Sequence, residues 1–383
     1  MNPLPLQELI LYTWKHSRLY RELWEKRGFN PNKDFSGPND LKRVPITTKG
    51  DFLSMRTQKR ALVSSKDYFY FVNPSSGTSA TPLISLHERY LVPGYYNFIE
   101  SMPQCRYSSV LVLRPGPYAN AFIGAALRDK FYHRGSIIAI GDPRELTFSA
   151  HIAREISMDR LVGDPATVNR FARNLQAADF LPSRITFLHI AGEPLTSAAV
   201  SLLRKLYPNA FTLFTYGISE SPSFIGIRSS LCSNLEKIHP NAYHLCTDTL
   251  VIEEVDGSLV ITAPYLIPTP LIRYDTGDRI IVRDNFECSC GFPKGRIGII
   301  GPRFDGKSYK IGTMALKAEA IQGILSAMSD FVTDDFVLQL EQIVEKGQLI
   351  VSPILTLRPA GSVPTLLITS AIQEIIENDR RIG

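Results

Sequence analysis

The stretch from Asn73 to Pro82 reads N-P-S-S-G-T-S-A-T-P, and six of its ten residues are Ser, Thr or Gly. It follows an aromatic segment, residues 67–73, that is predicted to be a strand. Small hydroxylated residues around a glycine let backbone N–H groups and side-chain O–H groups converge on phosphate oxygens. The Walker pattern G-x-x-x-x-G-K-[ST] is absent, so a phosphate site here is of another type. A flexible surface loop is the alternative interpretation.

Two further stretches offer groups suited to nucleotide chemistry. Residues 215–220 read T-Y-G-I-S-E, and a carboxylate such as that of Glu220 can hold a cation over the charge of a reacting phosphate. The rival interpretation is a hydrolase elbow around Ser219, but that elbow requires glycine at Ser221. Residues 271–278 read L-I-R-Y-D-T-G-D, and the two oxygens of Asp278 suit the vicinal diol of a ribose. A capped β-turn is the alternative there.

Cysteine and histidine gather between residues 232 and 290. Cys288 and Cys290 form a C-S-C-G segment, Cys232 lies upstream, and His239 and His244 lie between them. Three thiolates and one imidazole match the ligand set of a closed structural zinc site. In a cytosolic chain, paired cysteines favour a metal over a disulfide. Partly buried free cysteines are the alternative.

The elements that must position these residues follow from hydrophobic periodicity. Amphipathic helices are expected over residues 4–26. Strands are then expected at 110–113, 136–140, 160–163 and 185–190, and helices at 119–132, 147–158, 165–177 and 197–206. Such alternation predicts βαβ units and a mostly parallel, buried sheet. After about residue 210 the strand-like segments 248–255, 258–263 and 279–284 predict an antiparallel barrel or a β-rich subdomain.

The domain organisation expected from these patterns is a large domain over residues 1–302, with subdomains of about 1–210 and 211–302. A small domain over 303–383 mixes short helices and strands, including a short helix at 371–376, and the run 301–313 is expected to be a hinge.

Four motifs in the same order resemble those of the adenylate-forming (ANL) superfamily, in its phenylacetate–CoA ligase-like branch. They are the S-S-G-T-S-A-T-P loop, A-G-E-P-L at 191–195, Y-G-I-S-E at 216–220 and L-I-R-Y-D-T-G-D at 271–278. A-G-E-P-L follows a predicted strand, at the edge where parallel sheets bind ligands; alone, it is equally a structural turn. The resemblance implies an α/β fold: a large adenylating domain with layered parallel sheets and a β-barrel-like subdomain, followed by a truncated α+β domain.

The resemblance also implies a role for each matching residue. The phosphate loop comprises Ser75, Ser76, Gly77, Thr78 and Ser79. Gly192, Glu193, Pro194, Tyr216 and Gly217 would lie around the adenine, Ser219 near the phosphate, Glu220 at Mg²⁺ and Asp278 at the ribose, with Arg303 completing the nucleotide site. Thr78 and Glu220 would be catalytic. Similar proteins carry a Cys…His…Cys-x-Cys-Gly arrangement, which implies zinc ligation by Cys232, His244, Cys288 and Cys290, with His239 as the alternative histidine.

The match to the superfamily fails in three places. Ala80 replaces a usual glycine, and the hinge motif G-R-x-D-D is disturbed in G-P-R-F-D-G at 301–306. No lysine matches the C-terminal G-K-x-R segment, whose cation bridges carboxylate and α-phosphate during adenylation. One strong electrostatic contact of that kind supplies about 3–4 kcal/mol, so the first half-reaction should be slow unless Mg²⁺ or a partner protein substitutes.

The expected function is ATP- and Mg²⁺-dependent activation of an aromatic carboxylic acid as an acyl-adenylate. The acyl group would pass to CoA, an amine or a partner reductase. Truncated relatives act in antibiotic biosynthesis, including phenazine tailoring, and relatives are often homodimers. A degenerate protein that binds ATP or an aryl acid without turnover is the alternative. Phe122, Gly124 and Ala125 are the candidate lining of the acid pocket, although each is equally a core residue.

The composition fits a soluble enzyme of the cytoplasm. Hydrophobic residues make up 44% and charged residues 21% of the 383, and no apolar run is long enough for a bilayer. The N-terminus lacks a signal-peptide pattern. The net charge of +5 is spread through the chain, which gives little support to nucleic-acid binding.

Overall fold

The structure is a computed structural model that describes residues 4–60, 70–75, 82–88, 107–114, 132–265, 267–292, 295–303, 308–311, 314–317, 332–345 and 348–359. The expected helices at 119–132 and 371–376 lie outside these residues, apart from the last residue of the first, Tyr132, which begins a strand. So do Ala80 and the candidate pocket residues Phe122, Gly124 and Ala125.

Short helices form the N-terminal part of the chain. They are α1 (Leu6–His16), α2 (Arg18–Lys26), α3 (Pro31–Asp34), α4 (Lys49–Leu53) and α5 (Thr57–Arg60), with a 3₁₀ turn at Pro38–Arg43. In α2 the residues Leu19, Tyr20, Leu23 and Trp24 share one buried face, as the helical period requires. The helices expected at residues 4–26 are therefore confirmed.

A single sheet of eleven strands dominates the described residues, in the order β10-β11-β12-β13-β9-β8-β7-β6-β5-β3-β4. Its parallel part comprises β3 (Tyr107–Leu113), β4 (Tyr132–Gly141), β5 (Arg160–Gly163), β6 (Phe187–Ala191) and β7 (Phe211–Tyr216). The antiparallel part comprises β8 (Gly226–Ser229), β9 (Ala242–Leu245), β10 (Val251–Val255), β11 (Ser258–Thr262), β12 (Tyr274–Phe286) and β13 (Gly295–Arg303). The expected change to antiparallel strands after residue 210 thus occurs within one continuous sheet.

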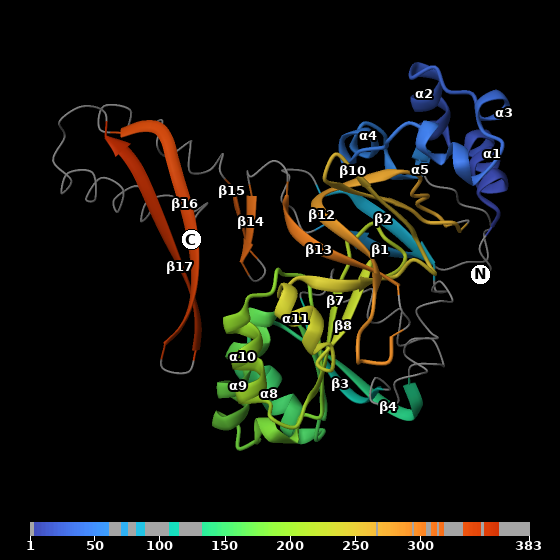
Figure 1. The fold of residues 1–383 in the computed structure, drawn as a ribbon. Helices are drawn as coiled ribbons and strands as arrows, with labels where there is room; N and C mark the ends of the chain where they lie inside the picture. Colours follow the sequence, from blue (N-terminus) through green and yellow to red (C-terminus); the bar gives the residue numbers. More distant parts are fainter. Residues whose placement is uncertain are drawn as a thin grey trace.

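Helices α8 (Leu146–Glu155), α9 (Pro165–Ala177) and α10 (Ser197–Leu206) lie together beside the parallel strands (Figure 1). Side-chain N-caps begin two of these helices. At α9 the Asp164 side chain accepts a hydrogen bond from the Thr167 amide, and at α10 the Thr196 side chain accepts one from the Ala199 amide. Strands β5 and β6 are almost completely buried, which explains why their residues are apolar apart from Arg160 and His189. A shorter 3₁₀ turn occupies Pro182–Arg184, and α11 (Ser233–Ile238) precedes β9.

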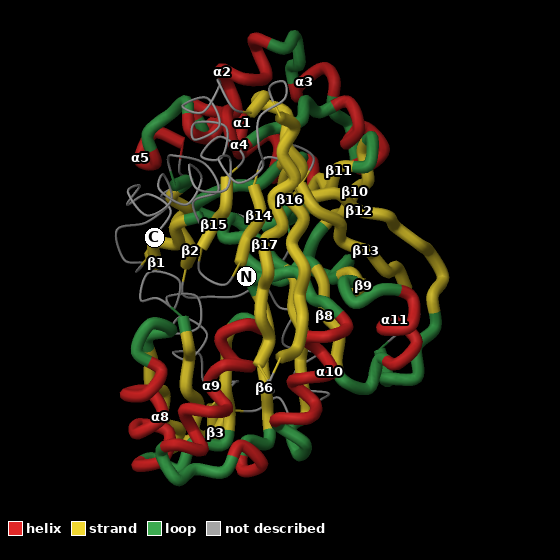
Figure 2. Tube along the Cα trace, turned by 90° about the vertical axis from the view of Figure 1, so that its left-hand side faces the viewer, coloured by secondary structure: helices red, strands yellow, loops and turns green. Residues whose placement is uncertain are grey.

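The remaining described strands form three separate hairpins. The pair β1 (Tyr70–Pro74) and β2 (Ile84–Glu88) flanks the hydroxyl-rich loop. The pairs β14 (Ser308–Ile311) with β15 (Met314–Lys317), and β16 (Val332–Glu345) with β17 (Gln348–Pro359), follow the main sheet. Figure 2 shows the long β16–β17 hairpin as two extended strands; β16 comes close to α10, and β17 to α9 and α10.

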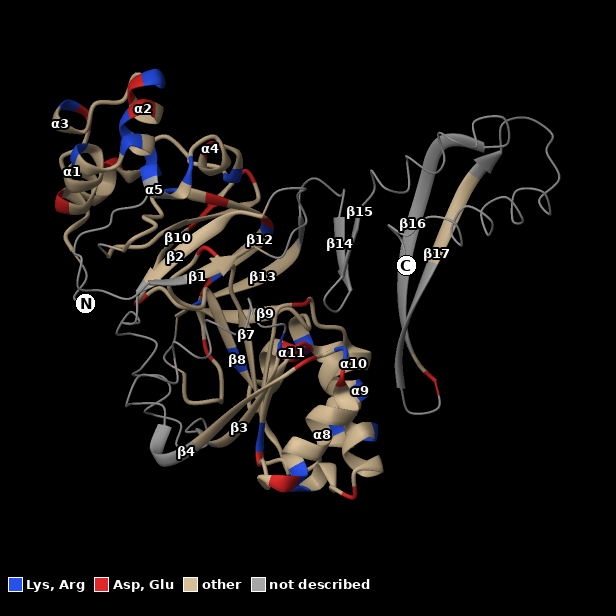
Figure 3. Cartoon of the chain, turned by 180° about the vertical axis from the view of Figure 1, so that it is seen from behind, with Lys and Arg blue, Asp and Glu red and all other residues tan. Residues whose placement is uncertain are grey.

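Positive and negative side chains are interspersed over the N-terminal helices and over α8 to α10 (Figure 3). Among the described residues, no helix has both the length and the apolar character needed to cross a bilayer.

Candidate functional site

The carboxyl ends of the parallel strands meet at one edge of the sheet, where open α/β sheets bind ligands. Tyr216 ends β7 at this edge, and Ala191 ends β6 beside it, paired in register with Thr215. The A-G-E-P-L and Y-G-I-S-E motifs therefore occupy neighbouring positions, as their sequence contexts indicated.

A hydrogen bond joins two of the motifs across the fold. The Tyr216 hydroxyl donates to Oδ2 of Asp278 at 2.5 Å, although 62 residues separate them. Asp278 lies near the start of β12, and its own amide donates to Oγ1 of Thr276 at 3.1 Å. In the strand register, Asp278 faces Arg303 on β13. This arrangement brings an aromatic ring and a carboxylate together, as a nucleoside site requires.

Glu220 lies in the same region and is 6% exposed. Its Oε1 accepts a hydrogen bond from the Tyr274 hydroxyl at 3.2 Å. Tyr274 is the first residue of β12 and belongs to the same motif as Asp278. Each of the two carboxylates therefore contacts the tyrosine of the motif that contains the other carboxylate. Glu220 and Asp278 are thus held on one scaffold.

The hydroxyl-rich loop is anchored at both ends. The Ser75 amide donates to the Leu83 carbonyl at 2.8 Å, and the Leu83 amide donates to Oγ of Ser75 at 2.9 Å. Ser76, Gly77, Thr78 and Ser79 lie outside the described residues. These two hydrogen bonds therefore hold the two ends of the loop, Ser75 and Leu83, together.

The strands that flank this loop contact the Glu220 segment directly. The carbonyl oxygen of Ser219 accepts a hydrogen bond from Nδ2 of Asn73 at 3.0 Å and lies 2.8 Å from Nε2 of His87. Asn73 belongs to β1 and His87 to β2. The base of the predicted phosphate loop consequently lies beside the predicted cation ligand.

Arg60 fixes the same hairpin to the N-terminal helices and was not predicted from the sequence. It is 3% exposed, and its Nη1 donates to the carbonyls of Phe52 and Met55 at 3.0 and 2.9 Å. Its Nη2 donates to the Ile84 carbonyl on β2. Burial lowers the pKa of Arg60, while nearby Tyr274 and Glu220 act in the opposite direction. No local pattern marks this residue, because its partners lie in distant segments.

The A-G-E-P-L turn is fixed by a side chain from a later segment. Asn241 accepts from the Leu195 amide at 2.6 Å and donates to the Leu195 carbonyl at 2.9 Å. Gly192 has φ +91°, and a Cβ there would lie 2.8 Å from Cζ of Arg114, whose guanidinium donates to the Ala191 carbonyl. The backbone conformation therefore favours glycine here, and any side chain would also displace the Arg114 guanidinium. Glu193 and Pro194 follow it in the same turn.

His189 lies beneath this edge, on β6, and is 1% exposed. Its Nε2 is 2.8 Å from Oγ1 of Thr215, and the ring of Phe224 packs edge-on against it. Burial, with a smaller contribution from Arg114, lowers the pKa of His189 to about 3. The imidazole is therefore neutral at physiological pH and serves as a hydrogen-bonded core residue.

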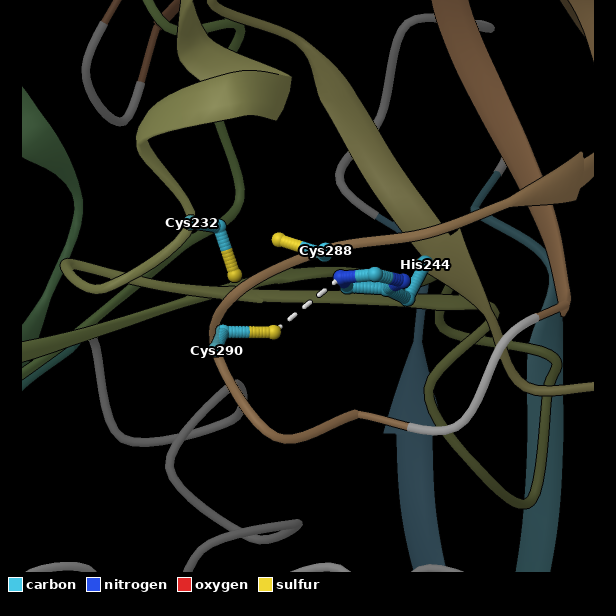
Figure 4. A group of neighbouring side chains, drawn as sticks. All are labelled: Cys232, His244, Cys288 and Cys290. Carbon is cyan, nitrogen blue, oxygen red and sulfur yellow. Dashed lines mark hydrogen bonds between the residues drawn. The ribbon is translucent and has the colours of Figure 1, made fainter.

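The predicted metal ligands converge at a second place in the fold. The ligand atoms of Cys232, His244, Cys288 and Cys290 all lie within 4.8 Å of one another (Figure 4). The Cys290 sulfur is 3.4 Å from Nε2 of His244. Tetrahedral zinc with Zn–S bonds of about 2.3 Å places its ligand atoms roughly 3.5–3.8 Å apart, so the four donors fit that ion. His239, the alternative ligand, lies outside the group; it is exposed, and its Nδ1 accepts from the Asn241 amide.

Three different elements supply this cluster. Cys232 precedes α11, His244 lies on β9, and Cys288 and Cys290 follow β12. Gly291, with φ +83°, allows the chain to turn directly after Cys290. The ring of Phe292 stacks on His244 with centroids 4.5 Å apart.

Hydrogen bonding gives the thiols of the cluster different pKa values. The contact with Cys290, helped by Ser229, lowers the pKa of Cys232, whereas the same contact raises the pKa of Cys290 to about 11. The Ser229 amide donates to the Cys232 sulfur at 3.4 Å. Cys232 is therefore the thiol most ready to ionise in the absence of a metal.

Comparison with solved structures identifies the fold. The chain is similar to 2-hydroxyisobutyryl-CoA ligase in complex with 2-HIB-AMP and CoA in the thioesterification state, with a TM-score of 0.70 and 18% identity over 97% of this chain and 80% of that one. The open conformation of the same ligase with 2-HIB-AMP and CoA gives a TM-score of 0.65, also at 18% identity, over 97% and 84%. This chain therefore shares the fold of 2-hydroxyisobutyryl-CoA ligase. No protein-family model matches the sequence, and no curated protein does.

Proposed function

We propose that this protein activates a carboxylic acid with ATP, forming an acyl-adenylate and pyrophosphate. The observation that carries the proposal is the paired linkage of Tyr216 to Asp278 and Tyr274 to Glu220. It brings together a ring, a carboxylate proposed to bind the ribose diol and a carboxylate proposed to bind a cation, beside the base of the proposed phosphate loop. The adenylate-forming fold supports the same reaction.

In this mechanism the carboxylate oxygen of the acid attacks the α-phosphorus of ATP, and the bond from that phosphorus to the β-phosphate oxygen breaks. Pyrophosphate is the leaving group, and Glu220 would hold a Mg²⁺ ion whose charge would offset that of the pyrophosphate. The loop from Ser75 to Ser79, with Thr78 at its centre, would hold the β- and γ-phosphates through N–H and O–H donors. Asp278 would accept from both ribose hydroxyls.

The adenine would lie between the Tyr216 ring and the turn of Gly192, Glu193 and Pro194. Gly217 and Ser219 continue the same wall toward the phosphates. Arg303 faces Asp278 in the β12–β13 register and is proposed to contact the nucleotide from that side.

The acid is proposed to be aromatic, and the acyl acceptor to be CoA or a partner reductase, as in phenazine-type antibiotic biosynthesis. Thioester formation would proceed by attack of a thiol on the acyl carbon, with AMP as the leaving group. The 2-hydroxyisobutyryl-CoA ligase that shares this fold binds CoA together with its adenylate, which supports a thiol acceptor. The protein is further proposed to be a cytoplasmic homodimer. In each subunit, residues 1–302 would form the adenylating domain and residues 303–383 a small domain.

A structural Zn²⁺ is proposed at Cys232, His244, Cys288 and Cys290. When bound there, the ion would cross-link α11, β9 and the β12–β13 loop, with no open coordination position for substrate. The donor set and the 3.4 Å spacing between the Cys290 sulfur and Nε2 of His244 support this assignment.

Pyrophosphate exchange tests the adenylation. The protein is incubated with ATP, Mg²⁺, labelled pyrophosphate and a panel of aryl and aliphatic acids, and label in ATP is counted. Acid-dependent exchange is expected with an aryl acid. Tight binding of ATP without exchange for any acid would instead establish the second candidate, a binding protein without turnover, which the altered hinge at 301–306 and Ala80 favour.

A further inference from the structure

Arg228 is a buried cation with no hydrogen-bond partner within the described part of the chain. It lies on β8 and is 1% exposed. Its Nε, Nη1 and Nη2 all lack a partner. The guanidinium carbon lies 4.5 Å from the centroid of the Phe214 ring, which covers one face of the cation.

An arrangement of this kind is costly unless negative charge lies nearby. Buried guanidinium groups in proteins are normally hydrogen-bonded to carboxylates or carbonyls, because water no longer solvates them. Contact with one aromatic face replaces only part of that solvation. The charge of Arg228 therefore points to a compensating anion in its surroundings.

Three groups favour the charged form of Arg228 electrostatically: Tyr243, Glu236 and Cys232. Burial raises the pKa of Tyr243 to about 12, so its phenol stays neutral. Glu236 is already engaged by Arg204, whose Nη1 lies 2.8 Å from Oε1 and whose Nη2 contacts Oε2. Cys232 is one of the four predicted metal ligands, and as a thiolate on a bound ion it would place negative charge near Arg228.

The backbone places Arg228 next to the metal cluster but on the other face of the sheet. In the register, Arg228 pairs with Phe214, whereas its neighbour Ile227 pairs with His244. Side chains alternate between faces, so Arg228 and His244 lie on opposite sides of β8 and β9. The next residue, Ser229, donates its amide to the Cys232 sulfur.

We infer that Arg228 is the counter-charge of the metal centre, neutralising the net negative charge of a divalent ion held by three thiolates and one imidazole. A divalent cation with three thiolates carries one excess negative charge, and Arg228 supplies one positive charge. It acts across the sheet through a low-dielectric interior, without contacting the ion. This inference rests on the proposed zinc centre.

The test compares zinc affinity in the full-length wild type, Arg228→Met and Arg228→Lys, measured by competition with a chromogenic chelator. Arg144→Met is the matched control, because Arg144 is an exposed arginine paired with Asp142. Zinc should bind roughly tenfold more weakly to Arg228→Met, the usual scale for loss of an outer partner. Arg228→Lys and the control should stay within about threefold of the wild type by the same standard.

Each other outcome is decisive. Equal affinity in Arg228→Met and the wild type overturns the inference while leaving the zinc centre intact. A tenfold loss in Arg228→Lys as well as Arg228→Met assigns the residue to packing and also overturns it. A wild type that takes up no stoichiometric zinc refutes the metal centre itself, which separates the two failures. If Arg228→Met does not fold, Arg228→Gln takes its place in the comparison.

Discussion

At the scale of single residues, the carboxylate of Asp278 is the group proposed to hold the ribose. It accepts a hydrogen bond from the Tyr216 hydroxyl and lies near the start of strand β12. An acceptor fixed in this way is organised before the sugar arrives, which reduces the entropy lost on binding.

Asp278→Asn should raise the KM for ATP in the exchange assay by about 10- to 100-fold, since hydrogen bonds to a charged group contribute roughly 1.5–3 kcal/mol. The KM for the acid should change little. Asp284→Asn on the same strand is the control, because Asp284 is exposed and forms its ion pair with Arg296. A KM for ATP unchanged in Asp278→Asn would remove the carboxylate from the nucleotide site.

His189 governs a pH dependence of stability. Its pKa is about 3 in the folded protein and ordinarily 6.5, so below pH 6.5 the unfolded chain binds a proton that the folded one does not. Above pH 6.5 the imidazole is neutral in both the folded and the unfolded chain, so it causes no pH dependence there. As the pH drops from 6.5 toward 3, the unfolded chain gains a proton, and the free energy of unfolding falls. The slope is about 1.4 kcal/mol per pH unit from this residue.

Denaturant unfolding at pH 7.0 and 5.0 measures this effect. His189→Asn should be less stable than the wild type at both pH values. Between pH 7.0 and 5.0, however, its free energy of unfolding should fall by about 1–2 kcal/mol less than that of the wild type. His151→Asn on α8, where the side chain is exposed, should keep the wild-type difference. Identical pH differences in all three proteins would contradict the assignment of a neutral buried imidazole.

At the scale of elements, the hairpin β1–β2 is held between the N-terminal helices and the Glu220 loop. Arg60 binds the Ile84 carbonyl from one side, and Asn73 and His87 contact the Ser219 carbonyl from the other. The loop that would hold the phosphates thus starts from a hairpin fixed on two sides.

Arg60→Met should destabilise the fold by about 2–4 kcal/mol, because several buried carbonyls lose their donor. In the protein that remains folded, the KM for ATP should rise more than kcat falls, since the hairpin rather than a reacting group is disturbed. Lys59→Met in the same helical turn is the control, because Lys59 is exposed. An Arg60→Met enzyme with unchanged stability and KM would show that the hairpin does not depend on this cation.

At the scale of the whole molecule, the cysteine–histidine cluster connects strands that are distant in sequence. If it holds zinc, a strong chelator should lower the Tm by roughly 5–10 °C, because a tightly bound ion stabilises the folded state by several kcal/mol. Cys290→Ser should abolish this sensitivity to chelator. Cys246→Ser should retain it, since Cys246 is buried outside the cluster. A chelator effect that persists in Cys290→Ser would locate the metal elsewhere.

The sequence predicted those parts of the fold that depend on local signals. Helix α9 starts at Pro165 after a capping aspartate, and strands β5 and β6 are mostly apolar because they are buried. The gathering of cysteines and a histidine was predictable because only one residue separates Cys288 from Cys290. Of the two candidate histidines, His244 lies in the cluster and His239 outside it, since β9 pairs with β13 and places His244 opposite Ile297.

The unpredicted residues share one property: their partners come from distant segments. Arg60 contacts β2, the Tyr274 hydroxyl reaches Glu220, and Arg228 lies over Phe214. A buried arginine looks in sequence like any surface arginine, because only the tertiary fold decides which charges lose their water. The roles of the phosphate-loop residues remain predictions.

Strand β12 begins at Tyr274, passes Asp278 and leads into the segment that carries Cys288 and Cys290. One continuous strand therefore connects the carboxylate that is proposed to hold the ribose with the segment of the cysteine cluster. If Asp278 binds the ribose, a displacement of Cys288 and Cys290 would be passed along this strand and would change the affinity for ATP.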